Sequence, residues 1–203
     1  MTVNMNIAII GGGFYGCYFA NKLSKKHNVT LFEKNNSLFK EAGLNNQYRL
    51  HKGFHYPRSA ETIQQTYKGY NKFLKEFSTF LYFPKKNYYI IHKNSQINFK
   101  KYISKFSKKF NYSIVKIETI KNLKNPGQFE GAINTNEGVI LINGLRTHLI
   151  RKIKKNCKIK FNTNIECVDS NKGIITVENK SYKFDKILNT TYTNPNLGLN
   201  KKI

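Results

Sequence analysis

The sequence predicts an α/β fold, a parallel sheet into which a β-rich (α+β) portion is inserted. Residues 6–10 and 28–33 are short, nearly continuous apolar runs, which are typical of parallel strands buried on both faces. A helical stretch at about 14–25 separates them, so the chain opens with a βαβ unit. Residues 83–142 carry short aromatic strands with no linker before them, which favours an insert over a second, separate domain.

The remaining elements are predicted from their periodicity. Residues 34–58 have no clear period beyond a helical turn near 37–41, and a loop this long in a compact chain is usually functional. A helix is expected from about 60 to 80, with Ser59 as its N-cap and Glu61 in its first turn. We expect two more helices at 97–110 and 145–155, and strands at 87–92, 113–118, 129–134, 138–142, 158–161, 165–168, 173–177 and 186–190.

The composition excludes several classes of protein. Of the 203 residues, 39% are hydrophobic and 14% aromatic, which excludes a disordered chain. No apolar run approaches the ~18–20 residues that span a bilayer. The N-terminus has no basic leader and no cleavage site, so we expect no signal peptide. Cys17, Cys157 and Cys167 are odd in number and widely spaced, which fits free thiols in a reducing cytoplasm.

The formal net charge of +24 invites a nucleic-acid-binding interpretation, but the distribution of charge argues against it. Of the 35 basic residues, 31 are Lys and only four are Arg, and the lysines are spread over the whole chain. A groove binder is expected to cluster its cations and to use Arg for bidentate phosphate contacts. Codons of A and T alone can encode Lys, Asn and Ile, so an AT-rich genome accounts for the bias. We therefore expect a small-molecule substrate and no specific nucleic acid.

The turn between the first strand and the first helix has the spacing Gly11-x-Gly13-x-x-Gly16. The first glycine suits a tight turn, the second lets the backbone approach a pyrophosphate, and the third permits close packing of the helix. Glu33 ends the second strand, where a carboxylate can accept hydrogen bonds from ribose hydroxyls. Strand, turn, helix and acid together predict a Rossmann-type FAD/NAD(P)-binding sheet. The alternative is a glycine-rich turn in an unrelated α/β domain.

The loop that follows the second strand is the other candidate for function. It must lie at the carboxyl edge of the sheet, where ligands bind in open α/β folds. Its residues 45–58 include His51, His55 and Arg58. The four-residue spacing of the histidines suggests a helical metal pair, but Gly53 and Pro57 oppose a helix and no carboxylate or Cys stands nearby, so we expect no metal site. A solvated polar loop remains the alternative.

The glycine motif with Glu33 and the loop Asn46-Gln-Tyr-Arg-Leu-His-Lys-Gly-Phe-His-Tyr-Pro-Arg-Ser59 resemble FAD-dependent oxidoreductases of the D-amino-acid oxidase/glycine oxidase superfamily. Within it, the loop is most similar to the L-2-hydroxyglutarate oxidase-like branch, which matches at Asn46, His51, Gly53 and Tyr56. The resemblance implies FAD as the cofactor and hydride transfer from a C–N or C–OH carbon to the flavin. His51, His55 and Arg58 are then the expected catalytic residues. The expected cofactor-binding residues are Gly11, Gly13, Phe14, Tyr15, Gly16, Glu33, Lys34, Asn46, Gln47, Cys167 and Thr190.

The resemblance also implies a domain organisation. The FAD-binding domain is expected to be discontinuous, formed by residues 1–82 and 143–203, with 83–142 as part of a substrate domain. The chain departs from the family at Thr190, which replaces a small residue or glycine, and in its length, which indicates a C-terminally truncated member. Two alternatives stay open. One is a flavoprotein similar to sugar-nucleotide mutases, and the other is a non-catalytic nucleotide-binding or basic binding protein, for which the Lys-aromatic stretch 100–110 is the best support.

Overall fold

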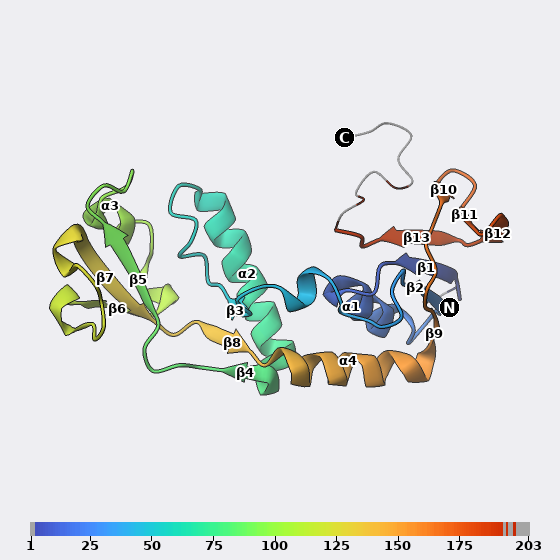
Figure 1. Cartoon of the computed structure of the whole chain (residues 1–203), viewed down its shortest axis with the longest axis horizontal. Coiled ribbons are helices and arrows are strands. Elements are labelled where there is room, and N and C mark those ends of the chain that lie inside the picture. The colour runs from blue at the N-terminus through green and yellow to red at the C-terminus, as the bar shows by residue number, and fades with distance from the viewer. Residues whose placement is uncertain (1–2, 193, 195–196, 198–203) are drawn as a thin grey trace. The chain divides into compact units, whose positions relative to one another are not determined.

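The computed structural model describes residues 3–192, 194 and 197 (Figure 1). Its contacts divide the chain into two compact units. The first unit consists of Met1–Gln47 and Ile142–Ile203, and the second of Tyr48–Leu141.

The first unit is built on a four-stranded parallel sheet, as predicted. Its order is β13-β1-β2-β9, and every neighbouring pair is parallel. Because β1 lies between two other strands, four of its five residues are buried. The strands are β1 (Asn6–Ile10), β2 (Asn28–Phe32), β9 (Cys157–Lys160) and β13 (Lys186–Asn189).

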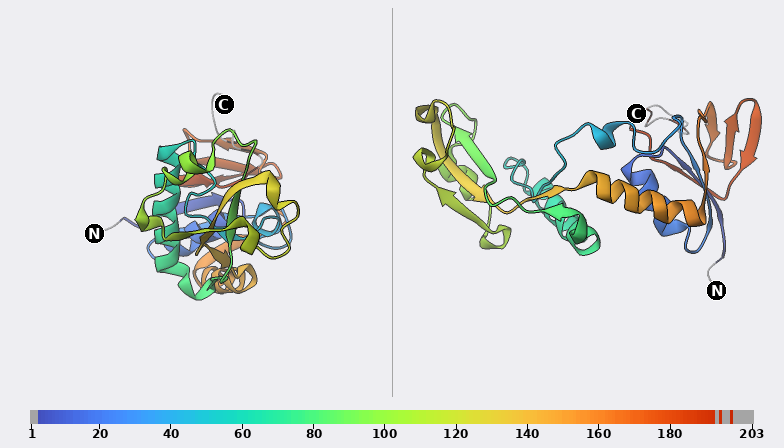
Figure 2. Two further views of the ribbon diagram at one scale, coloured as in Figure 1. Left: turned by 90° about the vertical axis from the view of Figure 1, so that its left-hand side faces the viewer. Right: turned by 60° about the horizontal axis from the view of Figure 1, so that its bottom comes forward.

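Other elements of the first unit pack on this sheet. The helices α1 (Phe14–Leu23) and α4 (Ile142–Asn156) contact each other (Figure 1). α4 buries Leu145, Leu149 and Ile153 at a spacing of four residues, which is one face of a helix. A small antiparallel sheet of β10 (Cys167–Asp169), β11 (Ile174–Val177) and β12 (Lys180–Lys183) contributes Ile175 and Val177 to a core with Ala8, Ile10 and Phe32 (Figure 2).

The second unit contains the long helix α2 (Ala60–Phe77), whose start is the one predicted. The Ser59 side chain accepts a 3.2 Å hydrogen bond from the amide of Thr62, and Glu61 lies in the first turn. Two antiparallel sheets accompany it, with the orders β3-β8-β4 and β5-β7-β6. Their strands are β3 (Arg49–Leu50), β4 (Leu81–Tyr82), β5 (Tyr88–His92), β6 (Tyr112–Val115), β7 (Phe129–Thr135) and β8 (Gly138–Ile140).

The helix predicted at 97–110 is wrong in its length. The helix α3 covers only Phe99–Ile103, and a separate 3-10 turn follows at Lys108–Phe110. Ser104 caps α3, and its hydroxyl bonds back to the Lys101 carbonyl, so the helix ends there. The aromatic residues beyond it still enter the core: Phe106 and Phe110 are 5% and 1% exposed.

The helical turn predicted near 37–41 is also wrong, because Phe39 has a φ of +64°, which a right-handed helix does not allow. A 3-10 turn forms instead at Ala42–Leu44. Three short strands were not expected: β3, β4 and β12.

The division of the chain differs from the predicted domain bounds. Residues 48–82, which include α2, belong to the second compact unit, whereas the predicted FAD-binding segment runs to residue 82. β5 belongs to the sheet of β7 and β6 and not to the parallel sheet. The assignment of one unit to the cofactor and of the other to the substrate stays a prediction. Residues 198–203, the end of the predicted FAD-binding segment, lie outside the described residues. Within the described chain, no helix is both long and apolar enough to cross a membrane.

Candidate functional site

The glycine turn leads from the carboxyl end of β1 into α1. Gly11 has a φ of +100°, and its amide donates a 2.8 Å hydrogen bond to the Phe32 carbonyl. A Cβ on Gly16 would lie 1.9 Å from the Gly11 carbonyl oxygen. Glycine is therefore required at residue 11 by backbone conformation and at residue 16 by the close packing of the helix on the turn.

Gly13 is different, because nothing in the described part of the chain requires it to be glycine. Its φ of −74° and ψ of −169° are accessible to any residue, and an added Cβ would meet no atom of the described residues within 4 Å. It is also the N-cap of α1 and supplies no side-chain hydrogen bond to the first turn. An uncapped helix N-terminus with open space beside its backbone suits a phosphate group. The turn therefore fits the pyrophosphate of a dinucleotide.

Glu33 is tied to this turn. Its Oε2 atom accepts a 2.6 Å hydrogen bond from the Gly12 amide, and its Oε1 atom accepts bonds of 2.8 and 2.9 Å from the backbone and side chain of Asn35. The residue is only 6% exposed. A carboxylate accepts about four hydrogen bonds, so Oε2 retains the capacity for one from a ribose hydroxyl. Gly12 also matters, because a Cβ there would lie 2.8 Å from Oε2.

Thr190 follows the strand β13 and closes the turn from the other side. Its amide donates to the Ile10 carbonyl at 2.9 Å. Its hydroxyl lies within donor distance of two carbonyl oxygens, that of Ile10 at 2.8 Å and that of Gly11 at 3.0 Å. Thr190 thus contributes a side-chain link between the strand end and the glycine turn.

The other predicted cofactor-binding residues also belong to the first unit. Phe14 and Tyr15 begin α1, and Tyr15 is 67% exposed. Lys34 pairs with Glu41 at 3.2 Å, and the Asn46 side chain donates to the Ala42 carbonyl at 3.1 Å. Gln47 and Cys167 are exposed, the latter on β10. Hydrogen bonds therefore join Glu33 and Thr190 to the turn, whereas Lys34 forms an ion pair with Glu41.

The second unit holds a cluster of charged and polar groups around Glu137, which is fully buried in the turn between β7 and β8. Its Oε1 atom accepts a 2.6 Å hydrogen bond from the Lys52 amide, and its Oε2 atom one of 2.7 Å from the Tyr89 hydroxyl. Arg49 Nε and His51 Nδ1 lie 3.4 and 3.7 Å from Oε2. Burial raises the pKa of Glu137, but the nearby His51 ring and the hydrogen bonds from Lys52 and Tyr89 outweigh it and hold that pKa below its ordinary value.

His51 and His55 lie together in this cluster. Their ring centroids are 4.4 Å apart, and the His55 ring lies 5.0 Å from the Tyr89 ring. The Nδ1 atom of His51 is 3.4 Å from the Tyr89 hydroxyl oxygen. Burial and then the neighbouring His51 lower the pKa of His55. Two of the three predicted catalytic residues are therefore neighbours, with a carboxylate beside them.

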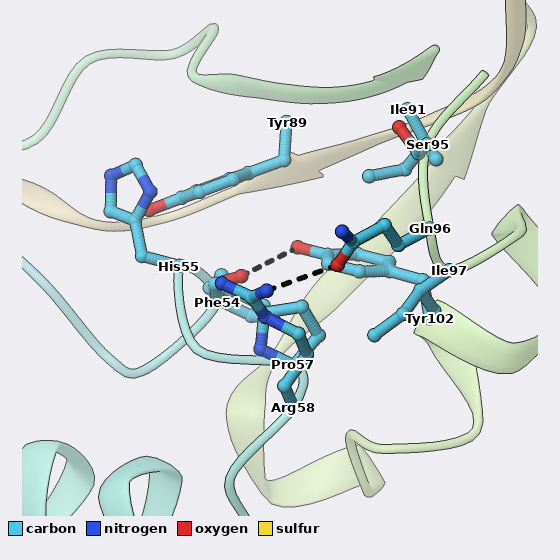
Figure 3. A pocket seen from close by; sticks show the side chains of 10 residues that line it. All are labelled: Phe54, His55, Pro57, Arg58, Tyr89, Ile91, Ser95, Gln96, Ile97 and Tyr102. Carbon is cyan, nitrogen blue, oxygen red and sulfur yellow. Dashed lines mark hydrogen bonds between the residues drawn. The ribbon is translucent and has the colours of Figure 1, made fainter. Parts of the chain in front are cut away.

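Arg58 and His55 line one pocket of about 420 Å³ in the second unit (Figure 3). Arg58 donates a 3.0 Å hydrogen bond to Gln96 Oε1, and Tyr102 donates one of 3.1 Å to the Phe54 carbonyl. Aromatic and aliphatic groups form most of the wall, and Arg58, His55 and Gln96 are among its polar groups. The lining residues are Phe54, His55, Pro57, Arg58, Tyr89, Ile91, Ser95, Gln96, Ile97 and Tyr102.

Sequence reasoning missed Glu137, Tyr89 and Arg49. An acid in the polar turn 135–137 has the local pattern of a solvent-exposed residue, so nothing near it indicates burial. Arg49 offered one usable signal. It precedes His51 by two residues in an extended segment, and that period places both side chains on one face.

Lys52 is also more than a surface lysine. It is 4% exposed, and its Nζ atom donates to the Phe110 carbonyl at 3.1 Å and to Asn136 Oδ1. Among the residues that the structure describes, no group of three or more His, Cys, Asp or Glu side chains is arranged to hold a metal ion.

A parallel sheet with an open glycine turn and a tethered acid at its carboxyl edge defines a dinucleotide-binding protein. The model of the FAD dependent oxidoreductase family matches residues 6–200, so the chain belongs to that family. The predicted superfamily, the α/β fold class and FAD as the cofactor are thereby confirmed.

Relatives of known sequence or structure agree with this membership. The chain is 44% identical to the FAD-dependent monooxygenase FPY4 of Fusarium mangiferae over 73 residues, which are 36% of this chain and 20% of that protein. It is similar to L-proline dehydrogenase from P. horikoshii, with a TM-score of 0.70, 18% identity, and coverage of 100% of this chain and 58% of that one.

The structure is also similar to glycine oxidase from Geobacillus kaustophilus, with a TM-score of 0.65, 12% identity, and coverage of 94% of this chain and 56% of that one. Identities this low show the fold alone. The chain therefore spans little more than half the length of these structural relatives, and its matched segment spans a fifth of FPY4.

Proposed function

We propose that the protein oxidises a C–N or C–OH bond of a small, carboxylate-bearing substrate. FAD, when bound, supplies the hydride acceptor. The observation that carries the proposal is Gly13, where an added Cβ meets no protein atom and the first turn of α1 has no side-chain cap. This open turn suits the pyrophosphate of FAD, the family's cofactor.

The first unit is assigned to the cofactor. The backbone around Gly13 and the N-terminus of α1 hold the pyrophosphate, and Glu33 Oε2 accepts a hydrogen bond from a ribose hydroxyl. Phe14, Tyr15, Lys34, Asn46, Gln47 and Cys167 keep their sequence-based assignments as further cofactor contacts. The Gly12 amide holds the Glu33 carboxylate at one place, which reduces the entropy lost when the ribose binds.

The second unit is assigned to the substrate. The planar guanidinium of Arg58 suits a bidentate pair with a carboxylate. It lines the same pocket as His55, whose wall of Phe54, Tyr89 and Tyr102 suits an apolar body. His51 and His55 are the groups that accept the proton released when the substrate's amine or hydroxyl is oxidised.

A second candidate, a monooxygenase reaction, is favoured by one observation, the 44% identity to the monooxygenase FPY4 over 73 residues. In that reaction an oxygen atom from O₂ enters the product. An oxidase instead releases hydrogen peroxide, and a dehydrogenase passes its electrons to another acceptor.

The test uses the protein expressed from its complete reading frame and reconstituted with FAD. Under anaerobic conditions, a panel of 2-amino and 2-hydroxy acids is mixed with the protein and the flavin absorbance is followed. We expect at least one acid to bleach the flavin, and Arg58→Met to raise the acid concentration needed for half the effect at least about tenfold. Glu118→Gln, an exposed change in the same unit, is the control. Flavin that no acid bleaches but that NADPH reduces, with ¹⁸O₂ entering the product, would establish the monooxygenase instead.

A further inference from the structure

The hydrogen bonds around Glu137 determine which nitrogen of His51 carries the proton. We infer that Glu137 and Tyr89 are positioning residues that keep Nδ1 of His51 protonated, so that its Nε2 atom is the proton acceptor. The inference rests on the proposed function only for the use it gives to Nε2. The arrangement of protons itself follows from the contacts of the second unit.

The first step concerns the Tyr89 hydroxyl. It donates its only proton to Glu137 Oε2 at 2.7 Å. Burial and then the charge of Glu137 raise the pKa of Tyr89, so the hydroxyl stays protonated and remains a donor. Its oxygen therefore has only lone pairs to offer to other neighbours.

The second step concerns the surroundings of His51 Nδ1. Among the residues that the structure describes, its near polar neighbours are the Tyr89 oxygen at 3.4 Å and Glu137 Oε2 at 3.7 Å. Both are acceptors, because the tyrosine proton is committed and an ionised carboxylate has no proton to donate. Nδ1 can donate a hydrogen bond to these acceptors only when it carries a hydrogen. Neutral imidazole has one N–H, so Nε2 is left with its lone pair.

The third step is the balance of charge around the ring. Glu137 is the acid beside His51. The cation that faces the same carboxylate is Arg49, with its Nε atom 3.4 Å from Oε2. Lys52 contributes its neutral backbone amide, which donates to Oε1, whereas its ammonium group donates to the Phe110 carbonyl and to Asn136. His55 lies 4.4 Å away and has its pKa lowered by burial. Because Arg49 shares the carboxylate with His51, Glu137 holds both side chains in one orientation.

Two other histidines provide an internal contrast. The Nδ1 atom of His27 accepts a hydrogen bond from the Met5 amide at 3.4 Å, and that of His92 accepts one from the Asn94 amide at 3.0 Å. An Nδ1 atom that accepts a backbone N–H cannot carry a hydrogen itself. These two rings are therefore expected in the opposite tautomer, with the hydrogen on Nε2.

The experiment is a long-range ¹H–¹⁵N correlation spectrum of the FAD-loaded chain with ¹⁵N-labelled histidine, recorded at alkaline pH. The five histidines are assigned by single His→Gln substitutions. We expect the Nδ1–H pattern for His51 and the Nε2–H pattern for His27 and His92. Glu137→Gln and Tyr89→Phe should each shift the His51 tautomer ratio toward Nε2–H at least about tenfold. Glu118→Gln, which changes an exposed acid of the same unit, should leave it unchanged.

An Nε2–H pattern for His51 in the unmodified protein would overturn the inference, whatever the variants do. The spectrum of the unmodified protein therefore tests the inference even if a variant fails to fold. An unchanged ratio in folded Glu137→Gln and Tyr89→Phe would also overturn it. The outcome is separate from that of the proposed function. If His51 has the expected tautomer but His51→Gln retains substrate oxidation, the role of His51 in catalysis fails while the inference stands.

Discussion

The amide of Gly12 donates a 2.6 Å hydrogen bond to the carboxylate of Glu33, and this bond ties the glycine turn after β1 to the end of β2. Neighbouring parallel strands end at the same edge of a sheet, so their terminal residues come within hydrogen-bond reach. The pair places a negative charge beside the start of α1. The residue that is expected to recognise ribose is therefore also part of the framework of the turn.

Gly13→Ala should separate cofactor binding from stability. An added Cβ meets no protein atom, so the free energy of unfolding without FAD should change by less than about 1 kcal/mol, the loss of a glycine N-cap included. FAD affinity should fall at least tenfold, because the methyl group occupies the space beside the turn. Urea denaturation and flavin fluorescence titration measure the two effects. Equal FAD affinity in the variant would show that the phosphates lie elsewhere.

Gly16→Ala is the matched contrast. Its Cβ would lie 1.9 Å from the Gly11 carbonyl oxygen, so the helix must shift away from the turn. We expect about 2–3 kcal/mol of destabilisation without FAD, the range that overpacking produces. A variant as stable as the unmodified protein in urea would contradict the close packing of α1 on the turn.

Glu33→Ala and Glu33→Gln should differ in stability but not in cofactor binding. Alanine leaves the buried Gly12 amide without its acceptor, at a cost of about 1–3 kcal/mol. Glutamine retains a carbonyl oxygen for that amide and should cost less. Both lose the charged acceptor for the ribose, so both should weaken FAD binding. Isothermal titration calorimetry with FAD and urea denaturation of each variant test this. A glutamine variant that binds FAD normally would remove Glu33 from the ribose site.

Glu137 should make stability depend on pH. Its pKa in the folded chain lies below the ordinary value of 4.5, so its contribution is present above that value and is lost as the pH falls through the folded-state pKa. Below about pH 5, the free energy of unfolding should fall more steeply with acid in the unmodified protein than in Glu137→Gln, whereas above that pH the two curves should run parallel. At neutral pH that variant should lose about 3 kcal/mol, because Arg49 is left without its buried partner. Parallel pH curves in urea denaturation would refute this.

Lys52→Ala should destabilise the second unit, although the loop position alone suggests a harmless change. The substitution leaves the Phe110 carbonyl and Asn136 without a donor and removes a cation 5.1 Å from the Tyr70 ring. We expect a loss of about 2 kcal/mol. Lys52→Met keeps the aliphatic volume and should lose less. Thermal denaturation of the two variants compares them, and equal melting temperatures for all three proteins would show that the ammonium contributes nothing.

The sequence by itself determined the βαβ unit that opens the parallel sheet, the glycine turn within it and the start of α2, because each depends on residues close together in the chain. Apolar runs make buried strands, the spacing of Gly11, Gly13 and Gly16 marks a phosphate-binding turn, and Ser59 caps the helix that follows it. The histidines of the loop were singled out by the place of that loop after the second strand and by its resemblance to the family.

Only the tertiary structure decided the surroundings of those histidines. Glu137 accepts hydrogen bonds from the Lys52 amide, 85 residues away in the chain, and from the Tyr89 hydroxyl, 48 residues away. Three segments of the chain bring these groups together. The periodicity of the residues near Glu137 does not indicate that its turn is buried. The same holds for the aromatic residues Phe106 and Phe110, which reach the core although the helix predicted to carry them ends at Ile103. A polar group is buried only where distant strands contribute its hydrogen-bond partners, because without those partners the free energy of its desolvation would destabilise the fold.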